Sequence, residues 1–305
     1  MDSCRQDLPV LMGRMNSVFK ETFQRYLTMF EQTLAQLPWG NDVLNQSMYY
    51  SLVGGGKRIR PVLALASAET VGGDPELIAP AAVALELIHT YSLIHDDLPA
   101  MDNDDYRRGR LSNHKVFGEA NAILAGDGLL TYAFELLADP QLGQPERQLR
   151  IIRDVAIAAG KAGMVGGQVA DVAGEGKSLT LNEIEEIHKA KTGALLTASA
   201  RLGGILAGGT EEQILALTSY AQALGLAFQI KDDILDVVGD SETLGKPAGS
   251  DQRQNKVTYV SLLGLKGAEQ QLHTQIQAAL SALKSFGEEP IFLSELAYYI
   301  EQRQH

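Results

Sequence analysis

Apolar residues recur along the chain with helical spacing, and no stretch of useful length alternates in the two-residue period of a strand. Breaks rich in Gly and Pro, such as 38–40 and 72–75, separate the helical segments. The pattern predicts helices at residues 8–36, 41–53, 60–71, 76–98, 118–138, 146–173, 180–207, 211–238, 255–265, 268–285 and 290–303.

Several predicted helices begin with a recognisable cap. Residues 180–183 (Thr-Leu-Asn-Glu) form a capping-box pattern, and Thr210 precedes two acids at a helix start, where the helix dipole favours them. Asp74 is predicted to cap a helix that has Pro75 in its first turn. Many helices are apolar on more than one face, which is typical of helices inside a bundle. Because no linker, repeat or low-complexity tract divides the chain, we expect one all-α domain over residues 1–305.

Composition narrows the function classes. The 305 residues are 45% hydrophobic, which is enough for a large core, so wholesale disorder is excluded. The formal net charge is −12, so the protein is a poor general nucleic-acid binder, and any phosphate must be held by local cations or metal ions.

Its location is expected to be cytoplasmic. Cys4 is the single cysteine, which excludes an internal disulfide and a cysteine zinc site and suits a reducing compartment. The first residues lack the pattern of a signal peptide, and the uncharged stretch 213–230 carries too many polar groups for a lipid-exposed span. We therefore expect no transmembrane segment.

The first acidic cluster, residues 96–105, holds five carboxylates and ends an apolar helix. Acids oppose the dipole at a helix C-terminus, so this placement costs stability. Pro99 disfavours a regular helix, so the chain must loop out after Asp97 for Asp102 to rejoin Asp96. A solvated acidic turn is the alternative; a shared metal site explains the loop better.

The second acidic cluster lies within a predicted helix. Asp232 and Asp236 are four residues apart, about 40° around the helix axis, and Asp233 is three before Asp236. Like charges at this spacing repel, and a bound Mg²⁺ removes the conflict. Carboxylates without histidine favour a hard cation rather than zinc. We expect the two clusters to face each other across a cavity.

Basic residues complement the acidic clusters. The segment 54–61 lacks P-loop spacing, but its flexible glycines and three cations at a helix start suit an anion. Four further polar residues are equally compatible with a structural or solvent-exposed role without any ligand: His89, Lys191, Thr192 and Lys246. No Ser-His-Asp, Cys-His or nucleotide-binding signature is present. The set indicates a site that holds diphosphates through Mg²⁺.

Six segments together resemble the trans-prenyl (polyprenyl) diphosphate synthases, most closely the bacterial farnesyl diphosphate synthases. They are residues 55–61, 88–102, 107–109, 164–168, 191–193 and 228–236. The match covers about residue 25 to the C-terminus. It implies the isoprenoid synthase fold, a bundle of about ten or more helices around a central cavity, and a homodimer.

The resemblance implies a prenyltransferase that condenses isopentenyl diphosphate with dimethylallyl or geranyl diphosphate by way of an allylic cation. It implies three Mg²⁺ ions bound by Asp96, Asp102 and Asp232 and supported by Asp97, Asp233 and Asp236. The residues it assigns to the allylic diphosphate are Arg107, Lys191, Thr192, Gln229, Lys246 and Lys256. Those it assigns to isopentenyl diphosphate, which is bound without metal, are Lys57, Arg60, His89 and Arg108.

Product length is expected to depend on Tyr91 and Ser92, five and four residues before Asp96. In this family the residues upstream of the first motif form the floor of the prenyl pocket. A bulky Tyr91 about one 5.4 Å turn below the metals favours a C15 product, farnesyl diphosphate. The alternatives are a C20 synthase, with Tyr91 as core packing only, a terpene cyclase or diphosphate hydrolase, and an inactive regulatory subunit.

Overall fold

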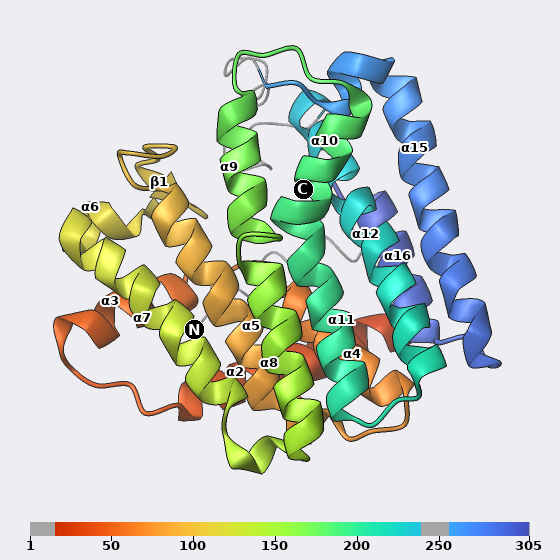
Figure 1. Cartoon of the computed structure of the whole chain (residues 1–305), viewed down its shortest axis with the longest axis horizontal. Coiled ribbons are helices and arrows are strands. Elements are labelled where there is room, and N and C mark those ends of the chain that lie inside the picture. The colour runs from red at the N-terminus through yellow and green to blue at the C-terminus, as the bar shows by residue number, and fades with distance from the viewer. Residues whose placement is uncertain (1–15, 239–255, 305) are drawn as a thin grey trace.

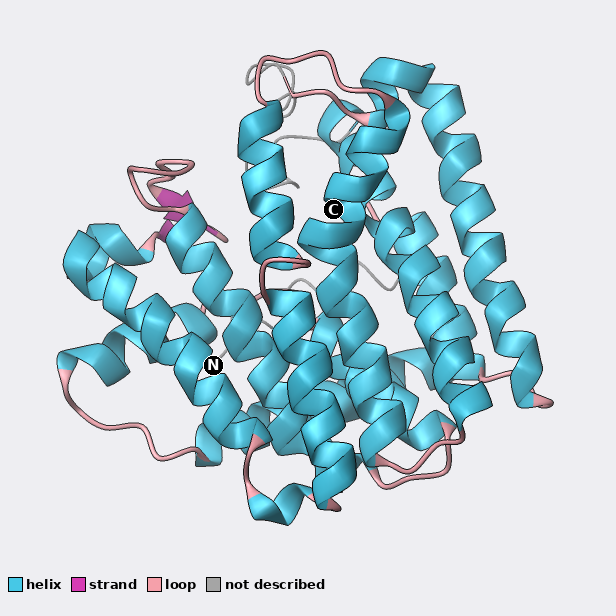
Figure 2. Ribbon diagram, in the orientation of Figure 1, coloured by secondary structure: helices cyan, strands magenta, loops and turns pink. Residues whose placement is uncertain are grey.

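The structure is a computed structural model that describes residues 16–238 and 256–304, and this part of the chain is almost entirely helical (Figure 1, Figure 2). The α-helices are α2 (Ser17–Gln36), α3 (Val43–Leu52), α4 (Ile59–Thr70), α5 (Pro75–Asp96), α6 (Asn113–Phe117), α7 (Glu119–Leu137), α8 (Pro145–Ala159), α9 (Met164–Gly174), α10 (Leu181–His188), α11 (Ala194–Leu206), α12 (Glu211–Val238), α15 (Tyr259–Leu283) and α16 (Ile291–Gln302). Short 3-10 or π segments are η1 (Pro140–Leu142), η2 (Lys189–Gly193) and η3 (Lys284–Phe286). Two-residue strands β1 (Tyr106–Arg107) and β2 (Arg110–Leu111) pair antiparallel.

The all-α prediction is confirmed, with corrections at several boundaries. The predicted helix 146–173 is wrong as one helix, because the chain leaves α8 at Gly160 and begins α9 at Met164. A Cβ on Gly163 would lie 2.0 Å from the carbonyl oxygen of Ala158, so only glycine permits this turn. Residues 8–15 of the first predicted helix lie outside the described residues.

Two other predicted boundaries also change. The predicted helices 255–265 and 268–285 form one element, α15, which kinks at Gly264, where φ is 70°. The predicted helix 180–207 is continuous, but it passes through the π-helical turn η2 between α10 and α11. The hairpin β1–β2 and the five-residue α6 were not predicted, because both are too short to show a period.

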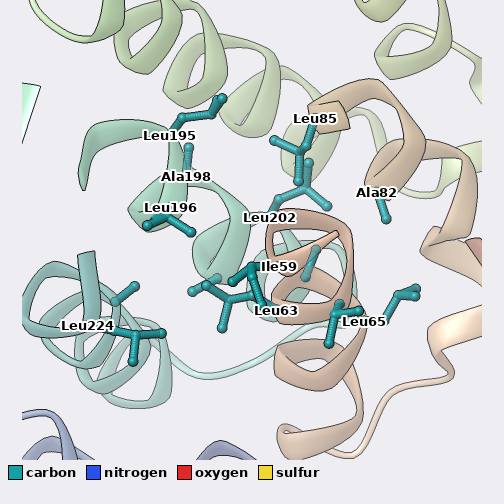
Figure 3. Packing of buried hydrophobic residues seen from close by; sticks show 14 of the residues in the cluster. Ile59, Leu63, Leu65, Ala82, Leu85, Leu195, Leu196, Ala198, Leu202 and Leu224 are labelled. Carbon is teal, nitrogen blue, oxygen red and sulfur yellow. The ribbon is translucent and has the colours of Figure 1, made fainter. Parts of the chain in front are cut away.

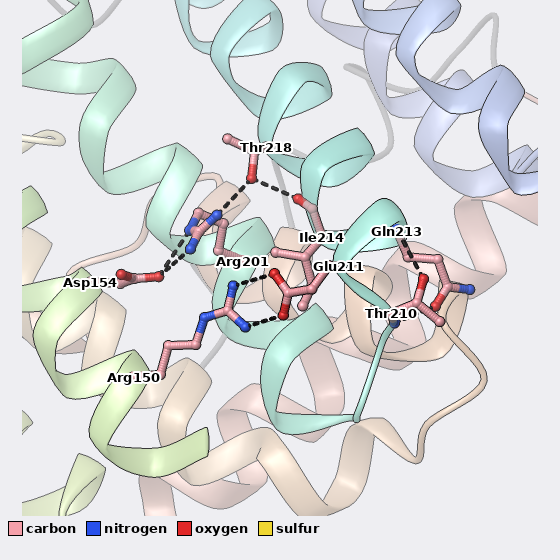
Figure 4. Close-up of polar contacts among 8 residues, drawn as sticks. All are labelled: Arg150, Asp154, Arg201, Thr210, Glu211, Gln213, Ile214 and Thr218. Carbon is pink, nitrogen blue, oxygen red and sulfur yellow. Dashed lines mark hydrogen bonds and ion pairs between the residues drawn. The ribbon is translucent and has the colours of Figure 1, made fainter. Parts of the chain in front are cut away.

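The predicted caps are present. Thr180 and Glu183 form the complete capping box at the start of α10. The Asp74 side chain accepts from the N–H of Glu76 at 2.9 Å, before the first-turn proline of α5. Thr210 caps α12 with Gln213 as its reciprocal partner (Figure 4), and the two acids Glu211 and Glu212 lie in the first turn as predicted.

The core lies where α4, α5, α11 and α12 meet (Figure 3). Leu63 and Leu202 are fully buried there. Helices α4 and α11 approach closely because Gly203 lacks a side chain, and a Cβ at that position would lie 2.0 Å from the carbonyl oxygen of Ala64. Small residues thus let apolar helices pack on several faces, as the sequence predicts.

Helix α5 is apolar all round and runs through this core. Among the described residues, α5 is the helix that is long and apolar enough to cross a membrane by length and composition. Of its apolar window, 72% is buried inside the bundle. The burial explains the apolar composition as that of a core helix.

Hydrogen bonds and ion pairs connect α8 to α11 and α12 (Figure 4). The Arg201 guanidinium donates to Asp154 at 2.7 and 2.9 Å and to the Thr218 hydroxyl at 3.0 Å. Arg150 pairs with Glu211 at the start of α12. Helices α5 and α12 both run upward in Figure 1, so their C-terminal ends carry the two acidic clusters to the same end of the bundle.

Candidate active site

The first acidic cluster folds back on itself at the end of α5. The backbone N–H of Asp102 donates to the carbonyl oxygen of Asp96 at 2.8 Å, and that of Asn103, in the left-handed region, donates to Leu98 at 3.1 Å. The chain therefore loops out and returns as predicted. Burial raises the pKa of Asp96 to about 6, and the Asp102 carboxylate adds to this increase.

Asp97 has a different role from its neighbours. It is buried, and its Oδ1 accepts from the Nε of Arg107 at 2.8 Å and also from Nη2. Arg107 stands on β1, so the ion pair fastens the short hairpin to the end of α5. The contacts of Asp97 make it the residue that holds Arg107 in place.

The hairpin also brings Arg108 to the basic loop before α4. Arg108 has a left-handed φ of 54° and donates to the carbonyl oxygen of Gly55. Its guanidinium lies directly against Gly56, where a Cβ would come within 2.5 Å of Cζ. Glycine at position 56 is therefore required for this contact, which the resemblance alone did not predict.

Four basic residues gather around this loop. Burial lowers the pKa of Lys57 to about 7, and Arg108 is among the neighbouring charges that lower it further. Burial also holds the pKa of His89 well below its usual range, with Arg60 and Arg108 as the next causes. His89 is therefore a neutral hydrogen-bonding group with cationic neighbours.

The second acidic cluster lies on an unbroken turn of α12, as predicted. Asp232 pairs with Nη2 of Arg303 at 2.6 Å. Asp233 is buried and accepts from the backbone N–H of Tyr259 at 2.8 Å, which anchors the start of α15. Asp236 is buried too, so the three carboxylates have distinct surroundings.

Arg303 is a site residue that the sequence did not predict. Its side chain is buried beneath the second cluster, its guanidinium lies 4.1 Å from the ring centroid of Phe228, and Nη2 donates to the Phe228 carbonyl oxygen at 2.9 Å. It also lowers the pKa of Lys57. In the sequence it is a single arginine 71 residues from Asp232, so spacing gives no signal of this pairing.

Lys191 is presented by the π turn η2, between α10 and α11. Its Nζ donates to Oδ2 of Asp171 on α9 at 2.6 Å. Helix α9 can pack closely against η2 because Gly167 has no side chain. A Cβ at this position would lie 2.3 Å from the backbone N of Lys191. Asp171 was missed; the segment 164–168, which carries part of the resemblance, stops three residues short of it.

The two clusters face one region through Lys191 and His188. Lys191 lowers the pKa of Asp96, so it lies near the first cluster. Burial lowers the pKa of His188 to about 4, Lys191 adds to this decrease, and Asp232 of the second cluster opposes it. Lys191 and His188 therefore connect the two acidic clusters electrostatically, from the end of α5 to the end of α12.

The other residues predicted from the sequence have varied positions. Thr192 on η2 and Gln229 on α12 are half-buried on elements that pack together, and Lys256 is half-buried before α15. Lys246 lies outside the described residues. Tyr91 is buried, with its ring centroid 5.7 Å from that of His95. The hydroxyl of Ser92 donates to the carbonyl oxygen of His89 at 2.8 Å, within α5 itself.

The donor set fits Mg²⁺ in one particular way. No three His, Cys, Asp or Glu side chains converge tightly enough to cage an ion within residues 16–238 and 256–304. Mg²⁺ typically takes one or two carboxylates and completes its shell with water and substrate phosphates. Asp96 is half-buried and Asp102 is exposed, and the Asp102 carboxylate helps to raise the pKa of Asp96, so a cation between them would relieve their repulsion and suits this binding mode.

An all-α bundle with two acidic clusters and a basic loop at one end is the architecture of isoprenoid synthases. The chain belongs to the polyprenyl synthetase family, whose family model matches residues 41–289. It is a prenyltransferase with the all-α isoprenoid synthase fold. The resemblance to the prenyl diphosphate synthases, on which the prediction of this fold and activity rests, is confirmed.

Named relatives are closely similar. The chain is 52% identical to a farnesyl diphosphate synthase of Geobacillus stearothermophilus over 86% of this chain and 89% of the relative. It is 47% identical to the farnesyl diphosphate synthase of Escherichia coli, covering 88% and 92%. A solved geranylgeranyl pyrophosphate synthetase from Pyrococcus horikoshii superposes with a TM-score of 0.83 at 35% identity, covering 93% and 98%.

Proposed function

We propose that this prenyltransferase joins isopentenyl diphosphate to dimethylallyl diphosphate and then to geranyl diphosphate, giving farnesyl diphosphate and releasing diphosphate. The observation that carries the proposal is that the charges of the two acidic clusters reach the shared neighbours Lys191 and His188, while a group of basic residues lies around the loop before α4. One substrate needs metal-assisted departure of its diphosphate, and the other must keep its diphosphate. Two differently charged sites suit these two demands.

The acidic side of the site would hold the allylic diphosphate. Asp96, Asp102 and Asp232 would bind Mg²⁺, which neutralises the diphosphate as it leaves. Lys191, with Arg107, Thr192, Gln229, Lys246 and Lys256, would contact its oxygens. At about 4 Å and an effective dielectric of about 20, one unit charge pair is worth about 4 kcal/mol, so several cations lower the barrier to ionisation substantially.

Isopentenyl diphosphate would be held directly by the basic residues Lys57, Arg60, His89 and Arg108. In the reaction the allylic C–O bond breaks and diphosphate leaves with the electron pair. The double bond of isopentenyl diphosphate attacks the cation and forms the new C–C bond. The proton that is then lost passes to the released diphosphate. Apolar side chains around the reacting carbon would keep water from the cation.

Chain length would be limited by Tyr91. This buried ring stands on α5 a little more than one 5.4 Å turn before Asp96, which is close to the length of one isoprene unit. A C15 product follows from this position, and the farnesyl diphosphate synthases among the relatives support it. The rival C20 product is supported by a geranylgeranyl diphosphate synthase from Cyanophora paradoxa that is 46% identical.

Replacing Tyr91 with alanine tests the chain-length proposal. We expect Tyr91→Ala to convert farnesyl into geranylgeranyl or longer products, because the removed ring leaves room for about one more isoprene unit. Tyr91→Phe is the matched control and should keep C15. A Tyr91→Ala protein that still makes only C15 would show that another residue closes the pocket.

The activity itself is tested with pure protein, Mg²⁺, isopentenyl diphosphate and each allylic diphosphate in turn, followed by chromatography of the products. We expect C15 as the main product. Release of diphosphate without chain growth would favour a cyclase or hydrolase. No turnover by the purified chain would favour a regulatory subunit.

We also propose a homodimer in the cytoplasm. Helix α7 exposes Ile123 at 45% and Leu124 at 56%, an apolar face that a second copy could cover. Sedimentation of the purified protein measures this directly. A monomer at micromolar concentration would contradict it.

A further inference from the structure

Arg58 lies between two residues assigned to isopentenyl diphosphate, yet its own side chain turns into the core. It is 5% exposed, and its Nη1 pairs with Oε1 of Glu86 on α5, which is 2% exposed, at 2.6 Å. Burying two charges is costly, and an apolar pair of similar volume is often as stable. Stability alone therefore gives little reason for this pair.

The pair fastens the basic loop at a strained point. Arg58 adopts a left-handed φ of 50° directly before α4, a conformation that is unfavourable for a residue with a Cβ. Its Nη2 donates to the carbonyl oxygen of Leu52 at the end of α3, and its guanidinium lies 5.4 Å from the ring centroid of Phe30. The side chain thus ties α3, α4 and α5 together at one point.

Glu86 also acts on Arg60. Burial lowers the pKa of Arg60 and the Glu86 carboxylate opposes that change, so one buried acid faces both arginines. Glu86 stands three residues, or about one turn, before His89 on α5. The acid is therefore central to the elements that present Lys57, Arg60 and His89.

We propose that the Arg58–Glu86 ion pair is a positioning element for the isopentenyl diphosphate end of the site, an inference that rests on the function proposed above. Neither side chain contacts substrate. The pair fixes the directions in which Lys57 and Arg60 leave the loop, relative to His89. Its loss shifts binding groups rather than removing them, and a misplacement of about 1 Å is enough to weaken a clamp of this kind severely.

The test replaces both charges with apolar side chains in one protein, Arg58→Met with Glu86→Leu. Because both partners of the ion pair are removed together, we expect the variant to fold, with a lower unfolding midpoint because the Leu52 carbonyl oxygen loses its donor and Arg60 loses its neighbouring acid. The KM for isopentenyl diphosphate should rise about tenfold or more, while the KM for geranyl diphosphate stays within about twofold. Arg58→Lys, which keeps the charge but loses the planar fork, should give a smaller rise in the same KM.

Arg25 and Glu69 supply the matched control. They form a 2.6 Å pair between α2 and α4, but their side chains are 44% and 45% exposed. Arg25→Met with Glu69→Leu should leave both KM values unchanged. A folded Arg58/Glu86 double variant with wild-type KM for isopentenyl diphosphate, or with equal increases in both KM values, would overturn the inference. If the wild type itself fails to elongate, the proposed function fails instead.

Discussion

Lys57 leads to a quantitative prediction of pH dependence. In the free protein, burial lowers the pKa of this lysine to about 7, and Arg303 and Arg108 lower it further against the opposing effect of Asp232. A bound diphosphate favours the charged lysine, so binding takes up a proton above pH 7. Affinity for isopentenyl diphosphate therefore falls as the pH rises, by up to about tenfold per unit, or about fiftyfold from pH 7 to pH 9.

The assay is the initial rate at pH 7, 8 and 9 with saturating geranyl diphosphate and Mg²⁺, from which the KM for isopentenyl diphosphate is taken. Lys57→Arg is the control, because a guanidinium stays charged over this whole range. We expect a steep rise in KM for the wild type and a nearly flat profile for Lys57→Arg. A flat wild-type profile, or the same slope in both proteins, would refute the assignment of Lys57.

Three further substitutions probe the metal site, the lysine support and the core. Asp232→Asn should lower kcat by about a thousandfold or more with unchanged circular dichroism, because it removes charge stabilisation at the leaving group; a near-normal rate would contradict this. Asp171→Asn should raise the KM for the allylic substrate about tenfold, because Lys191 loses its 2.6 Å partner, and an unchanged KM would show that Asp171 is dispensable. Leu63→Ala should lower the free energy of unfolding in urea by about 2–5 kcal/mol, because Leu63 is fully buried. The control Leu149→Ala should stay within about 0.5 kcal/mol of the wild type, because Leu149 is 68% exposed. Equal losses in the two variants would contradict the packing of the core.

The helices could be predicted because their apolar periods and caps are local properties of the sequence. The capping box at Thr180 and the cap at Asp74 appear in the structure as the sequence predicts. The break between α8 and α9 could not be predicted, because apolar residues continue through it and glycine is compatible with either conformation. The π turn η2 leaves no mark on the hydrophobic pattern, since the flanking helices keep their own periods.

The site could be predicted where several chemically similar residues lie close together in the sequence. Both aspartate clusters and the basic loop have this property, and in the structure the two clusters lie at the same end of the bundle, with Lys57 of the loop near enough to Asp232 for the two charges to interact. Arg303 and Asp171 do not, because each is a single charge whose partner is distant along the chain. Such pairings arise from helix packing, so they become visible only in three dimensions.

A double-mutant cycle on metal binding tests most directly whether the two acidic clusters form one site. Mn²⁺ would be titrated by electron paramagnetic resonance into the wild type, Asp96→Asn, Asp232→Asn and the double variant, each with an unreactive allylic diphosphate analogue. We predict that either single variant loses most of the analogue-dependent binding and that the double variant loses little more, a coupling of about 1–3 kcal/mol. Losses that simply add would contradict a shared site.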